Sequence, residues 1–144
     1  MVVYADTSFL FSLYAQDANT SAAAALAADV DLPFLCTPLQ WHELRNAVRL
    51  SLFRRDIDDV QAGRTFADIE GDLAAGVLRH TVVGWDEVFR CGEELGARHT
   101  PAVGTRSLDV LHVACALTLE CPVFLTFDHR QAILAAEAGL SVRP

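Results

Sequence analysis

Short apolar runs alternate with helical patterns along this chain, and this alternation limits the fold more than any other feature. The runs at 2–5, 34–37, 77–83 and 123–127 have the length and composition of buried strands. Each is followed by a segment whose apolar residues recur at helical spacing. This order predicts an α/β fold with a mainly parallel sheet.

The helices are expected at 7–14, 20–28, 39–54, 58–75, 85–98, 107–118 and 128–138. Pro101 and Gly104 predict a loop at 100–105, and 141–143 is expected to be an edge strand. The helix at 107–118 is apolar on nearly all sides, which predicts a central position. With 144 residues and no linker or internal repeat, residues 1–144 are expected to form a single domain.

The composition is that of a globular domain outside the membrane. Hydrophobic residues make up 52% of the chain and charged residues 21%, enough for a core and too apolar for disorder. The longest apolar stretch, Val110–Leu119, is interrupted by His112 and is too short to span a bilayer. The N-terminus has no basic region typical of a signal peptide. We therefore expect a cytoplasmic protein with no membrane partner.

The basic residues and cysteines exclude several classes of site. All 11 basic residues are Arg, so a P-loop lysine or a Schiff-base lysine is ruled out. The four cysteines form no CxxC pair, which argues against a zinc or redox motif and favours buried thiols. The net charge of −8 argues against nucleic-acid binding through a broad basic face. It does not exclude a nuclease in which acidic residues hold a metal ion.

Four acidic residues, Asp6, Glu43, Asp109 and Asp128, lie at or beside predicted strand–helix junctions. Asp6 and Asp128 close apolar strands, and ligands of open α/β sheets bind at the carboxyl ends of the strands. Glu43 and Asp109 lie near the starts of helices that can face the same edge. Because converging carboxylates repel one another, a hard cation such as Mg²⁺ or Mn²⁺ is the expected ligand.

Each acid also has a purely structural interpretation. Asp6 and Asp128 precede helices and are good N-caps, and Asp109 in a first turn favours the helix dipole. Glu43 alone is typical of a solvated helix residue. The joint placement of the four residues favours a metal site.

A metal in such a site activates water and polarises a phosphoryl oxygen, which predicts an enzyme acting on phosphate esters. Asp6 and Asp128 are the expected direct ligands. Glu43 and Asp109 are expected to bind the metal through water or to orient the attacking water. The hydroxyls of Ser8 and Thr126 are expected to steady a carboxylate or a bound water.

Four segments of the chain resemble, in order, the successive motifs of the PIN-domain ribonucleases, and the VapC-type toxins of bacterial toxin–antitoxin pairs in particular. They are residues 3–8 (VYADTS), 43–47 (ELRNA), 106–114 (RSLDVLHVA) and 124–128 (FLTFD). The last two motifs are the more specific. The resemblance covers essentially the whole chain.

The resemblance implies a three-layer α/β/α sandwich with a central parallel sheet and Mg²⁺- or Mn²⁺-dependent cleavage of single-stranded regions of RNA. It carries the four catalytic acids onto Asp6, Glu43, Asp109 and Asp128, and a hydroxyl near the last acid onto Thr126. It also implies a homodimer and a cognate antitoxin whose C-terminal segment wraps the toxin and often places an Arg among the acids.

Several other polar residues are candidates near this site. Arg45, Arg106 and Arg130 are expected to hold RNA phosphates, with ion pairing to nearby acids as the alternative. Asn46 either orients a carboxylate or finishes a polar helix face. His112 follows Asp109 on the same helix face, and a hydrogen-bonded core histidine is favoured over a metal ligand.

Three functions compete. The first is a toxin-type endoribonuclease. The second is another Mg²⁺-dependent phosphohydrolase or a DNA nuclease; a haloacid-dehalogenase-like phosphatase would require Asp where the chain has Ser8, together with a Lys. The third is a non-catalytic PIN-like scaffold, which the four retained acids disfavour.

Overall fold

The computed structural model describes residues 2–144, and its strands are all parallel. Strands β1 (Val3–Ala5), β4 (Val123–Leu125) and β5 (Ser141–Arg143) form a sheet in the order β1-β4-β5. Strands β2 (Phe34–Cys36) and β3 (Leu78–His80) form a second ladder, and β2 lies beside β1. The parallel sheet predicted from the sequence is confirmed, with its carboxyl ends all at one edge.

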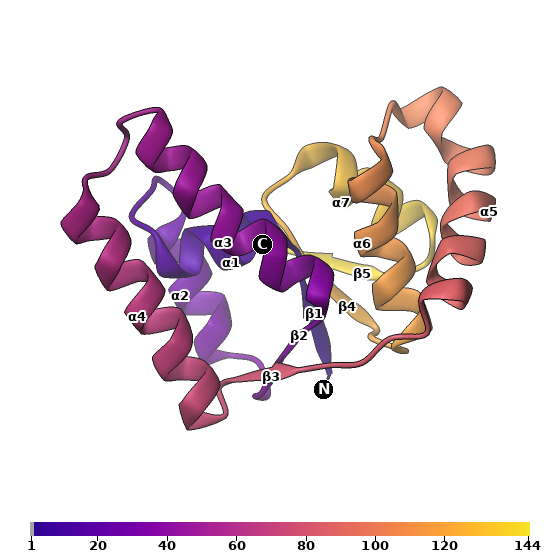
Figure 1. The fold of residues 1–144 in the computed structure, drawn as a ribbon. Helices are drawn as coiled ribbons and strands as arrows, with labels where there is room; N and C mark the ends of the chain where they lie inside the picture. Colours follow the sequence, from indigo (N-terminus) through magenta and orange to yellow (C-terminus); the bar gives the residue numbers. More distant parts are fainter. Residues whose placement is uncertain (1) are drawn as a thin grey trace.

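Helices cover both faces of these strands, which gives three layers (Figure 1). Helices α1 (Thr7–Tyr14), α2 (Thr20–Ala28), α3 (Pro38–Phe53) and α4 (Asp59–Ala75) pack on one side. Helices α5 (Trp85–Val103), α6 (Ser107–Thr118) and α7 (His129–Glu137) pack on the other. The fold is thus the α/β/α sandwich that the sequence predicts.

The pleat of the strands divides the core in two. In β1, Tyr4 points toward the α5–α7 layer while Val3 and Ala5 point toward the α1–α4 layer, since successive side chains of a strand alternate between faces. In β4, Phe124 stacks on Tyr4, with ring centroids 5.6 Å apart. Helix α6 is buried along nearly its whole length, so its predicted central position is confirmed.

Helix α5 is longer than predicted, and the loop expected at 100–105 is wrong. The helix continues through Pro101 to Val103 and ends at Gly104, whose φ of 73° closes it in the left-handed conformation. The Gly104 amide donates to Thr100 O (2.8 Å), and the hydroxyls of Thr100 and Thr105 lie 2.9 Å apart. Pro101 has no N–H to donate to the carbonyl four residues earlier, so the helix lacks one hydrogen bond there but continues, and Gly104 is the true stop signal.

Strand β3 is shorter than predicted. The apolar run at 77–83 pairs only over Leu78–His80, and the Val82 side chain is 93% exposed. Its one neighbour, β2, ends at Cys36 because Thr37 caps α3 and Pro38 begins it. Residues 81–83 therefore have no strand to continue the ladder with, whatever their β propensity.

The remaining expectations from composition can be checked directly. None of the helices within residues 2–144 is long and apolar enough to cross a membrane. The four cysteines are free, and burial raises the pKa of Cys36 and Cys121 to about 11 and that of Cys115 to about 12. Cys36, Cys115 and Cys121 are therefore buried packing thiols, as predicted, whereas Cys91 is only half-buried.

Candidate active site

Asp6 lies at the carboxyl edge of the sheet, where β1 passes into α1. The register of β1 with β4 brings it beside Thr126, and the Asp6 amide donates to Leu125 O (3.0 Å). Its Oδ1 accepts from the Phe9 amide (2.9 Å) and the Ser8 hydroxyl (2.7 Å), and its Oδ2 accepts from the Thr126 hydroxyl (2.6 Å). The capping role considered for Asp6 is therefore confirmed.

Asp6 is also a fully buried carboxylate without a cation. Burial raises its pKa above the usual value, and the hydrogen bonds from Thr126, Phe9 and Ser8 act in the opposite direction. No Arg within residues 2–144 forms an ion pair with it. An N-cap has no need of such burial, because capping residues function at exposed helix ends. The burial is the feature that points beyond a structural role.

Thr126 connects Asp6 to Asp128. Its hydroxyl donates to Asp6 Oδ2 and accepts from the Asp128 amide (2.9 Å). Asp128 in turn caps α7, with Oδ1 accepting from the Gln131 amide (2.9 Å). The hydrogen bonds expected for Ser8 and Thr126 are therefore present, and they tie the ends of β1 and β4 together.

Asp109 lies in the first turn of α6 and is nearly buried. Its Oδ2 accepts from the Arg106 amide (3.0 Å), and its Oδ1 accepts from the side-chain amide of Gln131 (3.3 Å). Gln131 thus connects Asp109 to Asp128. The three aspartates from β1, α6 and α7 belong to one hydrogen-bond network at one edge of the sheet.

Glu43 reaches this region from α3 through His112. The Nε2 of His112 lies 2.8 Å from Glu43 Oε1 and 3.2 Å from Oε2, and its Nδ1 lies 2.9 Å from the Tyr4 hydroxyl. Because the Glu43 carboxylate has only acceptors, Nε2 is the donor in the contact with Glu43. The prediction of a hydrogen-bonded core histidine is confirmed.

The network also joins Glu43 to the Asp6 side of the site. Thr7, next to Asp6, places its hydroxyl 3.4 Å from His112 Nε2. The fold therefore brings all four acids to one edge of the sheet through shared partners. Within residues 2–144, however, no three His, Cys, Asp or Glu side chains are arranged as a ready metal site. The four acids are neighbours in a network and do not form a closed cage.

The donor set nonetheless suits magnesium better than a softer metal. All four candidate ligands offer carboxylate oxygens, which Mg²⁺ and Mn²⁺ prefer. Mg²⁺ in proteins keeps several waters and commonly uses one or two carboxylates, so it needs no closed cage. Asp6 is buried and forms no ion pair with an Arg of residues 2–144, so a bound cation would stabilise its charged form. The carboxylates present therefore fit a Mg²⁺ or Mn²⁺ ion.

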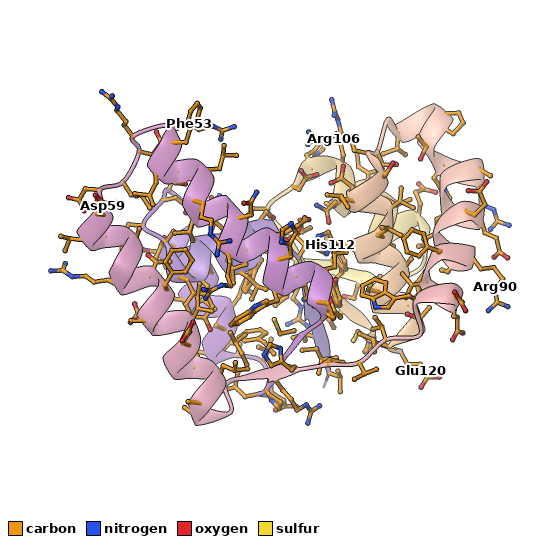
Figure 2. All side chains as sticks on the ribbon, in the orientation of Figure 1. Phe53, Asp59, Arg90, Arg106, His112 and Glu120 are labelled. Atoms are coloured by element: carbon orange, nitrogen blue, oxygen red, sulfur yellow. The ribbon has the colours of Figure 1, made fainter. Side chains whose placement is uncertain are left out.

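The structure places the other polar candidates outside the hydrogen-bond network or at its rim. Asn46 is exposed, and its side chain bonds to none of residues 2–144. Arg130 is exposed beside Asp128. The Arg106 side chain is 75% exposed at the start of α6, with Nε 3.6 Å from Asp109 Oδ2 (Figure 2). Both arginines are therefore exposed next to two of the acids, and Asn46 forms no hydrogen bond with any of the four.

Arg45 has partners of its own on the α3–α4 side. Its guanidinium lies over the rings of Trp41 (4.9 Å) and Phe66 (4.7 Å), and Nη1 pairs with Glu70 Oε1 at 3.2 Å. These contacts indicate a packing role between α3 and α4 and show the ion pairing that the sequence left open as the alternative to a phosphate contact.

Replacing Arg45 with Ala is expected to lower the free energy of unfolding by about 1–2 kcal/mol, because two cation–π contacts are lost. Chemical denaturation of the parent and the variant measures the difference. Unchanged stability would contradict a packing role for Arg45 and would leave the phosphate contact as its expected role.

Sequence reasoning missed Tyr4, Thr7 and Gln131 as parts of the site. Tyr4 and Thr7 flank Asp6 closely, so adjacency was an available signal for them. Gln131 follows Asp128 by three residues, and this spacing suggests a capping box. Nothing in the sequence indicates its contact with Asp109.

Comparisons with known proteins agree with this architecture. Among solved structures, VapC20 from Mycobacterium tuberculosis, described as a sarcin–ricin loop cleaving toxin, superposes with a TM-score of 0.70 at 22% identity, covering 99% of both chains. FitAcB from Neisseria gonorrhoeae gives a TM-score of 0.66 at 15% identity, covering 99% of this chain and 97% of the other. No curated protein matches the sequence.

At these identities the structural likenesses establish the fold. The family follows from the sequence itself, since the family model described as PIN domain matches residues 3–137. That range contains all four acids at the sheet edge. This chain therefore belongs to the PIN domain family.

Proposed function

We propose that this protein is a metal-dependent endoribonuclease that cleaves single-stranded regions of RNA and acts as the toxin of a toxin–antitoxin pair. The observation that carries the proposal is the buried, unpaired carboxylate of Asp6 joined by Thr126 and Gln131 to Asp128 and Asp109. The PIN family membership and the likeness to VapC20, a sarcin–ricin loop cleaving toxin, support the choice of substrate class.

In this proposal Asp6, Asp109 and Asp128 hold Mg²⁺ or Mn²⁺, directly or through water. When bound, the cation supplies an activated water and neutralises charge on the scissile phosphate. Glu43, which is partly exposed, orients the attacking water and accepts its proton. His112, fixed by Tyr4, keeps the Glu43 carboxylate in place by donating to Oε1.

Substrate contacts follow from the charge around this edge. Arg106 and Arg130 extend from the starts of α6 and α7, next to Asp109 and Asp128. We propose that they hold the phosphates that flank the scissile bond. With a net charge of −8, the protein has little general attraction for RNA. Binding then depends on these local contacts and on the cation.

We also propose a homodimer and a cognate antitoxin as partners, as the family resemblance implies. The surface supports contacts with other chains, since large apolar side chains are exposed at several places. Phe53 at the outer end of α3 is 84% exposed (Figure 2), and Phe89 on α5 is 59% exposed.

The direct test incubates the purified protein with RNA, single-stranded DNA and a generic phosphomonoester, each with Mg²⁺, Mn²⁺ or chelator. We expect RNA cleavage with either metal and a loss of at least about 100-fold in chelator, because the cation neutralises the phosphate and activates the water. Equal cleavage in chelator would contradict the mechanism. Turnover of the monoester alone would indicate a phosphatase, and binding without any turnover would indicate a scaffold.

A further inference from the structure

Gln131 makes the only side-chain hydrogen bond that links Asp109 to α7 within residues 2–144. Its backbone amide donates to Asp128 Oδ1 (2.9 Å), and its Nε2 donates to Asp109 Oδ1 (3.3 Å). The side chain is buried, with 5% of the residue exposed, and its Oε1 has no hydrogen-bond partner among the residues that the structure describes. A buried acceptor without a partner destabilises the fold and requires an explanation.

The chain itself contains two comparisons for this arrangement. Gln40 in α3 and Gln61 in α4 occupy the same third helical position as Gln131 does in α7. In both, Oε1 accepts from the N-cap amide, at 2.8 Å for Thr37 and 2.9 Å for Asp58, and closes a capping box.

Gln131 departs from this pattern because the amide of its N-cap residue is already taken. The Asp128 amide donates to the Thr126 hydroxyl, the same hydroxyl that donates to Asp6. The Gln131 side chain turns instead toward Asp109, and Oε1 is left without a partner. The hydrogen bond between Thr126 and the Asp128 amide therefore prevents Gln131 from forming the capping box that Gln40 and Gln61 form.

The direction of the amide is set by Asp109 alone. The opposite assignment of its oxygen and nitrogen would place Oε1 against the Asp109 carboxylate at 3.3 Å, where two acceptors repel. Helix capping requires only the backbone amide of Gln131, and an apolar side chain would fill the same buried space without an unpaired acceptor. Neither capping nor packing therefore explains a glutamine here.

We propose that Gln131 is a positioning residue that fixes the Asp109 carboxylate relative to Asp128 and thereby sets their spacing for a divalent cation. The inference rests on the proposed metal-dependent function and extends it to a residue outside the four acids. Residues that orient metal ligands typically change metal affinity by 10–100-fold when they are replaced. Gln131 acts on the cation only through Asp109.

The test measures Mn²⁺ binding to the full chain by titration calorimetry, for the parent and for Gln131→Met, which keeps the length of the side chain but has no N–H. We expect at least about tenfold weaker binding. In cleavage assays the variant should need more Mg²⁺ for half-maximal rate and should recover most of the parental rate at saturating Mg²⁺. In an Asp109→Asn background, Gln131→Met should have no further effect on Mn²⁺ binding.

Gln61→Met is the matched control, since it removes the same amide from the same helical position in α4. It should lower the melting temperature by a few degrees and leave Mn²⁺ affinity unchanged. Equal Mn²⁺ affinity for Gln131→Met and the parent would overturn the inference while leaving the proposed function intact. A parent that neither binds Mn²⁺ nor cleaves RNA would overturn both.

If Gln131→Met does not fold, NMR spectroscopy of the parent protein provides a second test. The side-chain ¹H–¹⁵N signals of Gln131 should shift on addition of Mg²⁺, with the same midpoint as the rise in cleavage. The corresponding signals of Gln61 should stay unchanged. Gln131 signals that do not respond to Mg²⁺ would overturn the inference.

Discussion

Replacing Asp6 with Asn is expected to reduce metal-dependent RNA cleavage by at least about 100-fold while the protein remains folded. The Asn oxygen can still accept from Phe9 and Ser8, and the Thr126 hydroxyl can turn to accept from the new amide, so the helix cap survives. What is lost is the negative charge. A cleavage assay beside a thermal melt of the same sample measures both effects.

The pH dependence of stability gives this prediction a definite sign. Burial raises the pKa of Asp6 in the folded protein, so the folded protein binds this proton more tightly than the unfolded chain does. The free energy of unfolding of the parent therefore falls as pH rises through that pKa. Asn does not titrate. In chelator, Asp6→Asn should therefore gain stability relative to the parent as pH rises, and the difference should shrink in acid. If the stability of Asp6→Asn relative to the parent fell between acid and neutral pH, the burial argument would be contradicted.

Asp58→Asn is the control for Asp6. Asp58 also caps a helix, with its side chain accepting from Gln61 N, but it is exposed and belongs to α4. Because it shares the capping role and lacks the burial, its replacement should leave cleavage within about twofold of the parent. Equal losses from the two replacements would mean that capping, and not charge at the site, explains the effect.

Replacing Asp109 with Asn is the second large effect, again a loss of at least about 100-fold in cleavage. The single Asn oxygen can still accept from the Arg106 amide, and the Gln131 side chain can turn so that its unpaired Oε1 accepts from the new Asn amide. We therefore expect stability to change by less than about 1 kcal/mol. Chemical denaturation and steady-state cleavage at several Mg²⁺ concentrations separate the two consequences.

The control for Asp109 is Asp86→Asn, since Asp86 also lies in the first turn of a helix and favours its dipole. Asp86 is exposed on α5 and is expected to contribute to stability only. Cleavage by Asp86→Asn should match the parent. If Asp109→Asn also cleaved RNA at the parental rate, Asp109 would have only the structural role that its position in the helix allows.

The sequence was sufficient to predict that Asp6 and Asp128 lie at one edge of the sheet. Asp6 directly follows β1, whereas Asp128 lies three residues after the end of β4, since β4 ends at Leu125 and not at Phe127 as predicted. Parallel strands bring their carboxyl ends to one edge whatever the details of packing. The capping interpretations of both residues are confirmed, and a cap at this edge also lies where the proposed metal ligand would be needed.

The contacts between helices could not be predicted in the same way. That Glu43 meets His112, and that Gln131 turns to Asp109, depends on how α3, α6 and α7 pack against one another. The local pattern favoured a capping box at Gln131, and this preference yielded to a contact with Asp109, which is distant in the sequence. The loop expected at Pro101 was wrong for a local reason, since the helix continues to Gly104. Arg45 likewise is drawn to Trp41 and Phe66 by the packing of α3 against α4.

The most direct test of the account is anomalous diffraction from crystals of the full chain soaked in Mn²⁺. We expect an anomalous peak at the carboxyl edge of β1 and β4, about 2.0–2.3 Å from oxygens of one or two of Asp6, Asp109 and Asp128, with water completing the shell. Manganese bound only elsewhere, with these carboxylates still joined to one another through Thr126 and Gln131 alone, would contradict it.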